Sequence, residues 1–349
     1  MSPFGTPRRG VFVQIFALPG AFAAIICTKT PAGAGHRLRA VETWTVETDD
    51  DGGRLEVHSF RPAALTPANG GSTPADGDPA PVTAPGVVVI HGTLVTDALY
   101  RPFARNLSLL LSRPVHCYNR RGRGRSAEQP DDYSVQTEIR DLAAVMKATG
   151  SEDVVAHSYG GFVALQAARE MPLRRLVTYD AAVSLSGNLN HRWRPELEQA
   201  VTDGQLNHAW AHLVQGLATA GPLSYLPLGA LRMLSIMSAR TNVGAEMREL
   251  LPTAVKEMRA VLDADAELAD FAELATPTLM LSGGWSPGYF ADTGRQLAGA
   301  VPAIEFALVP GQLHEGPIRP GKRLAIRMAR FLNGTDGTIT PRSRKRRRR

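Results

Sequence analysis

Cysteine is scarce in this chain, which has only Cys27 and Cys117 among its 349 residues. Two cysteines are too few for a disulfide framework or a cysteine-based zinc site. Cys117 lies in an apolar stretch that is typical of a strand, and we expect it to serve in packing. His208 and His212 are four residues apart on a predicted helix, but the sequence has neither an HExxH pattern nor a nearby third ligand. No metal or other cofactor is therefore expected.

An excess of positive charge is also missing from most of the chain. The formal net charge is +6, and residues 342–349 alone carry seven positive charges, so the remaining residues carry −1, the difference between +6 and +7. Composition therefore argues against a nucleic-acid-binding surface on the body of the protein. We expect residues 335–349 to form a disordered basic tail, and we expect no nucleic-acid partner.

A hydrophobic run long enough to cross a membrane is lacking as well. Residues 11–27 are apolar, but the run is short for a span and is broken at Pro19-Gly20. Two arginines precede it and small residues follow it, which is the layout of a secretory signal. We expect residues 1–35 to be an N-terminal extension, either a signal, an anchor or a loose segment. A cytoplasmic protein is the main expectation; secretion or membrane contact would depend on this extension.

Strands and helices alternate from about residue 86 onward, after two alternating runs within residues 40–62 that predict two strands. Residues 86–90 are apolar throughout, as in a parallel strand covered on both faces. This order predicts an α/β fold with a doubly wound, mostly parallel sheet of about eight strands flanked by helices. The other predicted strands are 115–119, one ending at 157, 176–179, 277–281 and 304–308, and the predicted helices are 99–112, 136–149, one beginning near 159, 289–300 and 322–332.

Strand patterning is absent from residues 184–274, which are mostly helical in pattern. We expect this segment to be a helical insertion after the strand that ends at Asp180. The domain as a whole is expected to span residues 36–334. Residues 62–85 are rich in Pro, Gly, Ala and Thr, which indicates an exposed and poorly ordered loop.

The most informative stretch, residues 153–161, predicts a buried strand, one exposed serine and the start of a helix. Gly160 and Gly161 have no side chains to clash at the abrupt turn, and Ala156 stands for the first glycine of the nucleophile elbow, G-x-S-x-G. A serine on such a turn has an accessible hydroxyl. Ser158 is therefore the candidate nucleophile, and it needs a base and an orienting acid from elsewhere. The alternative is a tight turn with a capping serine.

Residues 91–94 (HGTL) close the first parallel strand, at the edge where open α/β sheets bind their ligands. The backbone amides of Thr93 or Leu94, together with the amide of Tyr159, could hold a developing oxyanion. We interpret the side chain of His91 as a buried histidine that is satisfied by hydrogen bonds within its loop.

Two further polar segments follow predicted strands. Residues 120–126 (RRGRGRS) could suggest a phosphate site, but we interpret them as a structural turn whose arginines pin loops and whose glycines allow close approach. His314 follows the last strand, downstream of the elbow serine. It is the candidate general base.

With these pieces in place, the chain resembles the serine hydrolases of the α/β-hydrolase fold. The resemblance implies Ser158 as nucleophile, His314 as base, an oxyanion hole from the amides of Thr93 or Leu94 and Tyr159, and a helical cap over the pocket. It covers roughly residues 40–332, and its motifs occur in the family's order. The matching residues are 91–92, 120–126, 157–161 and 311–314.

The acid departs from the family's common pattern. Family members usually carry an aspartate two residues after a Gly-x at the end of the penultimate strand, and Ser286 stands there. Asp180 and Asp292 are the two substitutes. Asp180 is better placed, since a strand end holds a carboxylate more rigidly than a loop or a helix start. A dyad of Ser158 and His314 without an acid is the remaining alternative.

These residues predict a hydrolase that cleaves a carboxylic ester of a small molecule, or a related amide, thioester or lactone, through an acyl-enzyme. Two alternatives stay open: a cofactor-free perhydrolase or acyltransferase on the same residues, and a catalytically inactive binding protein of the same fold. Serine at the elbow argues against an aspartate nucleophile. Apolar residues of the predicted cap that could line the pocket, or only pack the cap, are Trp193, Trp210, Leu217, Leu226, Met233 and Met237.

Overall fold

The computed structural model describes residues 41–48, 52–62, 85–318 and 322–335. The predicted N-terminal extension, nearly all of the predicted Pro- and Gly-rich loop and nearly all of the predicted basic tail lie outside the described residues. Within the described ranges, no helix is both long enough and apolar enough to cross a membrane.

The predicted α/β fold is confirmed. The described residues form one eight-stranded sheet with the order β1-β2-β4-β3-β5-β6-β7-β8. Pairing is antiparallel at β1·β2 and β2·β4 and parallel from β4 to β8. The strands are β1 Glu42–Glu47, β2 Arg54–Phe60, β3 Gly86–Ile90, β4 Val115–Tyr118, β5 Ser151–His157, β6 Arg175–Tyr179, β7 Thr278–Gly283 and β8 Ile304–Val309.

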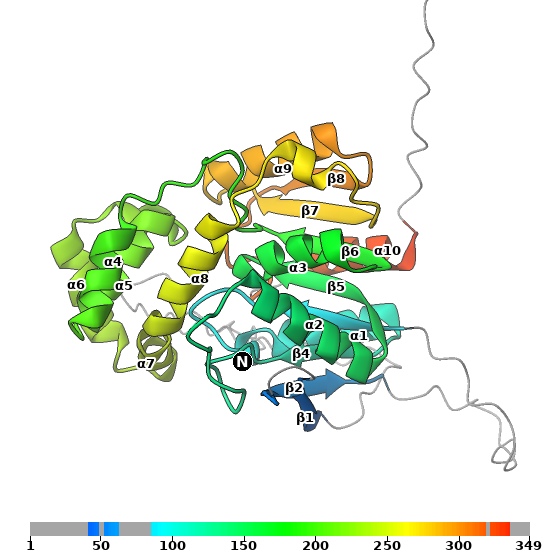
Figure 1. Ribbon diagram of the computed structural model, residues 1–349, viewed down its shortest axis with the longest axis horizontal. Coiled ribbons are helices and arrows are strands. Elements are labelled where there is room, and N and C mark those ends of the chain that lie inside the picture. Colours follow the sequence, from blue (N-terminus) through cyan, green and yellow to red (C-terminus); the bar gives the residue numbers. More distant parts are fainter. Residues whose placement is uncertain (1–40, 49–51, 63–84, 319–321, 336–349) are drawn as a thin grey trace, which may run out of the picture.

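Helices cover both faces of the sheet (Figure 1). One core packs α1 and α10 against the sheet, and the other packs α2, α3 and α9 against the opposite face. All five residues of β3 are buried, which explains why this central strand is apolar throughout. The flanking helices are α1 Arg101–Leu111, α2 Val135–Thr149, α3 Tyr159–Glu170, α9 Gly288–Ala300 and α10 Lys322–Asn333.

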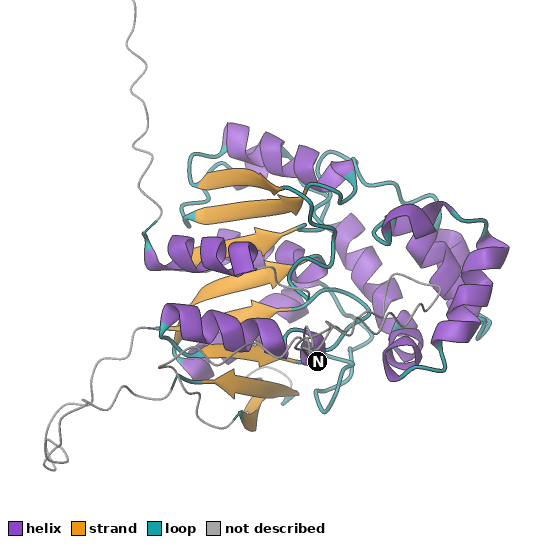
Figure 2. Cartoon of the chain, turned by 180° about the vertical axis from the view of Figure 1, so that it is seen from behind, coloured by secondary structure: helices purple, strands orange, loops and turns teal. Residues whose placement is uncertain are grey.

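A group of helices lies between β6 and β7, as the helical pattern of residues 184–274 predicted. We call it the insertion, and it forms a separate lobe beside the sheet in Figures 1 and 2. Its helices are α4 Arg194–Thr202, α5 Leu206–Leu217, α6 Leu228–Ser238, α7 Asn242–Glu249 and α8 Leu251–Asp263. The insertion also contains the 3-10 helices η2 Gly221–Tyr225 and η3 Leu268–Phe271, and a further 3-10 helix among the described residues, η1 Asp97–Leu99, follows β3.

Candidate active site

Ser158 lies on a sharp turn between β5 and α3. Its backbone has φ 56° and ψ −122°, a region that a non-glycine residue rarely adopts. The turn depends on Gly160, because a Cβ there would lie 2.7 Å from the carbonyl oxygens of both Ile90 and His91. Ser158 is mostly buried, yet its side chain lines a cavity. The geometry is that of a nucleophile elbow.

The structure brings Ser158, His314 and Asp180 together from three separate segments. His314 Nε2 lies 3.1 Å from Ser158 Oγ, and His314 Nδ1 lies 3.1 Å from Asp180 Oδ2. His314 follows β8, and its segment is held by Tyr179, whose hydroxyl donates to the Leu313 carbonyl at 2.7 Å. Because Tyr179 and Asp180 are neighbours at the end of β6, the same strand end positions both the carboxylate and the histidine.

Asp180 is buried and accepts hydrogen bonds from the loop after β7. Ser282 Oγ and the Gly283 amide donate to Asp180 Oδ1 at 2.7 and 3.1 Å. Ser286 Oγ donates to Asp180 Oδ2 at 2.6 Å, the same oxygen that faces His314. Three donors besides the histidine thus hold the carboxylate in place. Sequence reasoning noted Ser286 only as the place of a missing acid; its role as a donor to Asp180 was not predicted.

Asp292, the alternative acid, lies elsewhere. Its side chain is 64% exposed on α9, and its Oδ1 pairs with Arg295 Nη1 at 2.8 Å. An ion pair between residues three apart on a helix surface stabilises that helix slightly. The structure therefore brings Asp180, and not Asp292, to His314.

The segment after β3 packs directly against the elbow. A Cβ added to Gly92 would lie only 2.9 Å from Ser158 Cβ, so only glycine allows this approach. Leu94 has φ 56°, an unusual value for leucine, which marks a tight turn at the predicted amides of Thr93 and Leu94. Tyr159 provides the first amide of α3, and amides at this position have no partner within the helix. Both predicted sources of amides thus border Ser158.

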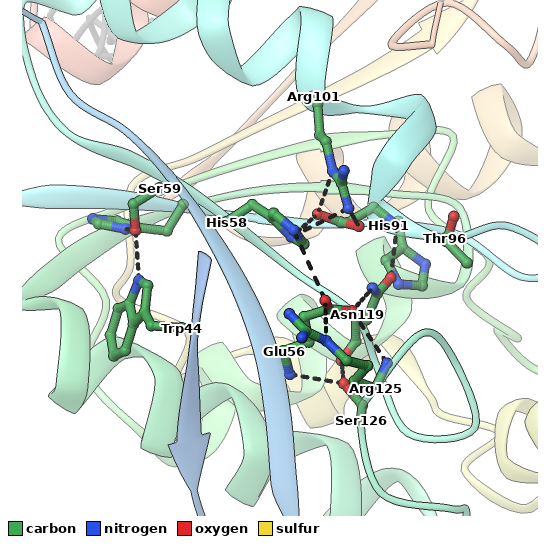
Figure 3. Close-up of polar contacts among 12 residues, drawn as sticks. Trp44, Glu56, His58, Ser59, His91, Thr96, Arg101, Asn119, Arg125 and Ser126 are labelled. Carbon is green, nitrogen blue, oxygen red and sulfur yellow. Dashed lines mark hydrogen bonds and ion pairs between the residues drawn. The ribbon is translucent and has the colours of Figure 1, made fainter. Parts of the chain in front are cut away.

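Buried polar contacts hold the residues that follow this segment, from Thr96 to Arg101, against β2 and the end of β4 (Figure 3). Asn119, after β4, accepts a hydrogen bond from the Asp97 amide at 2.9 Å and donates to Glu56 on β2 at 2.9 Å. The Asp97 carboxylate pairs with His58 at 2.7 Å and with Arg101 at 2.9 Å. These contacts join Asp97, which follows the segment, to β2 and to the residue after β4. None of them was predicted from the sequence.

The side chain of His91 is used structurally. Its Nδ1 lies 2.9 Å from the Gly92 carbonyl, and its Nε2 accepts a hydrogen bond from the Arg120 amide at 3.2 Å. Burial, and then the charges of Arg120 and Arg123, hold the pKa of His91 well below its ordinary value. Neutral His91 thus joins the segment after β3 to the arginine-rich turn.

A second buried histidine lies next to the site. His157 Nδ1 is 2.5 Å from the Tyr100 hydroxyl, and the His157 ring lies 4.6 Å from the His314 ring. Burial and then His314 hold the pKa of His157 well below its ordinary value, so this ring stays neutral. Phe290 stacks on His314 at 5.0 Å and 11°. These rings limit the orientations that His314 can adopt.

Two cavities meet at Ser158. The large chamber, about 310 Å³, lies under α4, α5 and α8, and the small chamber, about 80 Å³, lies between α5, α7 and the segment after β3. Of the predicted lining residues, Trp193 lines the large chamber, Trp210 the small chamber and Leu217 both. Leu226, Met233 and Met237 line neither chamber, and the two methionines are 57% and 43% exposed on α6. An amphipathic pattern does not tell which face of a helix the rest of the protein covers.

Metal ligands are not grouped in the described part of the chain. No set of three or more His, Cys, Asp and Glu side chains there could hold an ion. His208 and His212 lie on α5, among residues 206–217.

Comparisons with known proteins agree with this architecture. A model of the alpha/beta hydrolase family matches residues 87–324. An alpha/beta hydrolase from Sphaerobacter thermophilus is similar in structure, with 24% sequence identity and a TM-score of 0.63 over 83% of this chain and 100% of that one. A bromoperoxidase from Bacillus anthracis has 16% identity and a TM-score of 0.60 over 84% and 100%. An enol-lactonase from Burkholderia xenovorans has 18% identity and a TM-score of 0.57 over 85% and 100%. At such identities the likeness concerns the fold.

Proposed function

Because this chain belongs to the alpha/beta hydrolase family, we propose that it is a serine hydrolase that cleaves carboxylic esters of small molecules through an acyl-enzyme. Ser158 is the nucleophile, His314 the general base and Asp180 the acid that orients the base. The observation that supports this most is the chain of contacts from Ser158 Oγ through the His314 ring to Asp180, with 3.1 Å at each step.

In the first half of the reaction, His314 Nε2 takes the proton of Ser158 as Oγ attacks the ester carbonyl carbon. The negative charge that develops on the carbonyl oxygen is held by the amide of Tyr159 and that of Thr93 or Leu94. His314 then gives its proton to the leaving alcohol. The product of this half is an ester between Ser158 and the acyl group.

In the second half, His314 takes a proton from water, and the resulting hydroxide attacks the acyl carbon. The acid leaves and Ser158 regains its proton. Asp180 accepts from His314 Nδ1 throughout, which keeps Nε2 free to receive a proton and stabilises the imidazolium. The insertion forms a cap that lines both chambers and limits the access of water.

A fluorophosphonate probe tests the assignment. We expect covalent labelling at Ser158 in the wild-type protein and none in Ser158→Ala, which should also lose ester hydrolysis while keeping its circular dichroism spectrum. Labelling without hydrolysis, but with transfer of acetyl groups to peroxide or an alcohol, would move the function to perhydrolysis or acyl transfer. An unlabelled, correctly folded wild-type protein would favour a binding role and reject the hydrolase.

A further inference from the structure

The two chambers at Ser158 differ in the groups that line them. The small chamber is lined by apolar residues such as Leu94, Trp210 and Met247, and its lining also includes Glu315. It also borders His314, whereas the large chamber borders Tyr159 and does not include His314 among its lining residues. A substrate with its ester bond at Ser158 would place one part in each chamber.

The position of His314 decides which part goes where. His314 has to give its proton to the leaving oxygen, so the leaving group lies on the side of that ring. The small chamber opens onto His314. The leaving alcohol therefore occupies the small chamber, which has room for a short apolar group, and the acyl group extends into the large one.

The large chamber is more polar, but several of its polar side chains are already bonded. Asn188 Nδ2 donates to Thr293 at 2.8 Å, and Asn188 Oδ1 accepts from the Leu185 amide at 3.0 Å. Gln215 Nε2 donates to the Leu226 carbonyl at 3.3 Å. Among the described residues that line the large chamber, Arg194 is the only one that is charged at all ordinary pH values, and none is an aspartate or a glutamate.

The charge of Arg194 is only partly compensated. Its Nε lies 3.3 Å from Glu198 Oε1, but both oxygens of Glu198 are also held by Arg259, at 3.1 and 2.6 Å. The hydrogen bond from Arg259 is the main cause of the lowered pKa of Glu198, ahead of the charge of Arg194. Two guanidinium groups thus share Glu198, although Asp263 also attracts Arg259, so Arg194 has only part of one carboxylate as its ion-pair partner.

We propose, building on the hydrolase function above, that the large chamber binds an acyl group that ends in a carboxylate, and that Arg194 pairs with that carboxylate. The substrate class is then monoesters of dicarboxylic acids with short, apolar alcohols. A carboxylate held by a partly buried guanidinium in the lining of this chamber is recognised by both charge and position.

The test compares matched esters on the full-length protein. Monoethyl esters of dicarboxylic acids, from succinate to sebacate, are set against ethyl esters of monocarboxylic acids of equal chain length. We expect kcat/KM to favour the best monoester by about tenfold or more, the size of one charge-assisted hydrogen bond. Added salt should reduce this preference, because it screens a partly exposed charge pair.

Three variants assign the preference to Arg194. Arg194→Gln should reduce the ratio of kcat/KM between the two esters by about tenfold. Glu198→Gln removes the shared carboxylate and should keep or increase the ratio. Arg192→Gln is the matched control, because Arg192 is exposed and does not line the chamber, and it should keep the wild-type ratio.

The outcomes separate this proposal from the hydrolase function. If the fluorophosphonate labels Ser158 but the wild-type ratio is one or lower, or Arg194→Gln leaves the ratio unchanged, the carboxylate site is rejected and the hydrolase stands. If acetate esters of ω-hydroxy acids are the preferred substrates, the carboxylate lies on the alcohol side and the chamber assignment is wrong. Absence of labelling rejects both.

Discussion

Asp180→Asn is the substitution that probes the proposed acid most directly. Asparagine has the shape of aspartate and tolerates the backbone of this position, whose φ is 46°. Its amide orientation is set by the Gly283 N–H, which can only donate and lies 3.1 Å from Oδ1. The amide oxygen therefore takes the place of Oδ1, and the NH2 group faces His314 Nδ1.

This arrangement reverses the tautomer of His314. Nδ1 must then accept a hydrogen bond, so Nε2 carries the proton and cannot receive the one from Ser158. A flipped amide would restore the acceptor, but it would set two donors against each other at Gly283, which costs about 1–3 kcal/mol for a buried group. Only about one molecule in six to one in 160 would adopt it. The corresponding change in a serine protease lowers kcat by about 10⁴.

We therefore expect kcat on a chromogenic ester to fall by about tenfold to 10² in Asp180→Asn, with an unchanged circular dichroism spectrum and thermal midpoint. Asp292→Asn is the matched control, because its carboxylate only pairs with Arg295 on the helix surface, and it should keep wild-type kcat. A loss below about threefold in Asp180→Asn would refute the tautomer argument. An inactive Asp292→Asn beside an active Asp180→Asn would move the acid to Asp292.

Three other predictions concern a donor to Asp180, a buried histidine on β4 and two glycines. Ser286→Ala removes the hydroxyl 2.6 Å from Asp180 Oδ2 and should lower kcat by about tenfold, since a hydrogen bond to a charged group contributes about 1.5–3 kcal/mol. An unchanged kcat would show that the hydroxyl is dispensable. Burial lowers the pKa of His116 to about 4 from 6.5. Because the unfolded chain then binds the proton more readily, the free energy of unfolding should fall as pH drops from about 6.5 to about 4, by up to about 3 kcal/mol from this residue. Urea titrations of His116→Gln should show a smaller fall, and an identical pH dependence would contradict the assignment. Gly160→Ala should lower the thermal midpoint, because its Cβ would clash with backbone oxygens. Gly299→Ala, in open space near the end of α9, should instead raise it by the equivalent of about 0.5–1 kcal/mol. Equal shifts in calorimetry would contradict the steric argument.

The sheet and its flanking helices could be predicted because their signals are local. The strand expected at 115–119 is β4, Val115–Tyr118, and the helix expected at 136–149 is α2, Val135–Thr149. Apolar runs and a helical period depend on neighbours in the sequence, and burial on both faces of a central sheet imposes them directly. The order of the elements then leaves few topologies.

The partner of His314 could not be derived in the same way. The contact with Asp180 joins residues that are 134 positions apart, and it depends on how β6, β7 and β8 are aligned. Sequence reasoning ranked Asp180 above Asp292 only from the rigidity of a strand end. The donors Ser282 and Ser286 become visible only when the end of β7 lies beside the end of β6, because a serine has no pattern that marks its hydrogen-bond partner.

The arginine-rich turn is structural, as its sequence predicted, but the contacts of its first arginine with the residues around Ser158 were not predicted. Arg120 is fully buried, and its guanidinium donates to the Gly92 carbonyl at 2.8 Å and lies over the Tyr159 ring at 4.7 Å. It also pairs with Glu138 of α2 at 2.7 Å and with Glu257 of α8 at 2.8 Å. One side chain thus contacts both segments that supply the proposed oxyanion amides, as well as a helix of the insertion.

Burying such a network of charges costs free energy, and we infer that its contribution is to position α8 relative to the sheet. Burial alone would lower the pKa of Arg120 and raise that of Glu257, but their mutual attraction, with the charges of Glu138 and Arg123, reverses both shifts, so Arg120 and Glu257 remain charged. Replacing buried ion pairs by apolar groups is often neutral or stabilising, whereas removing one partner costs about 3–5 kcal/mol. An apolar contact has little directional preference, whereas the Arg120 guanidinium donates hydrogen bonds to Gly92 and Glu138 and pairs with Glu257 of α8. These directed contacts fix the position of α8. Arg120 thereby ties the insertion, which lines the large chamber, to the two segments that border Ser158.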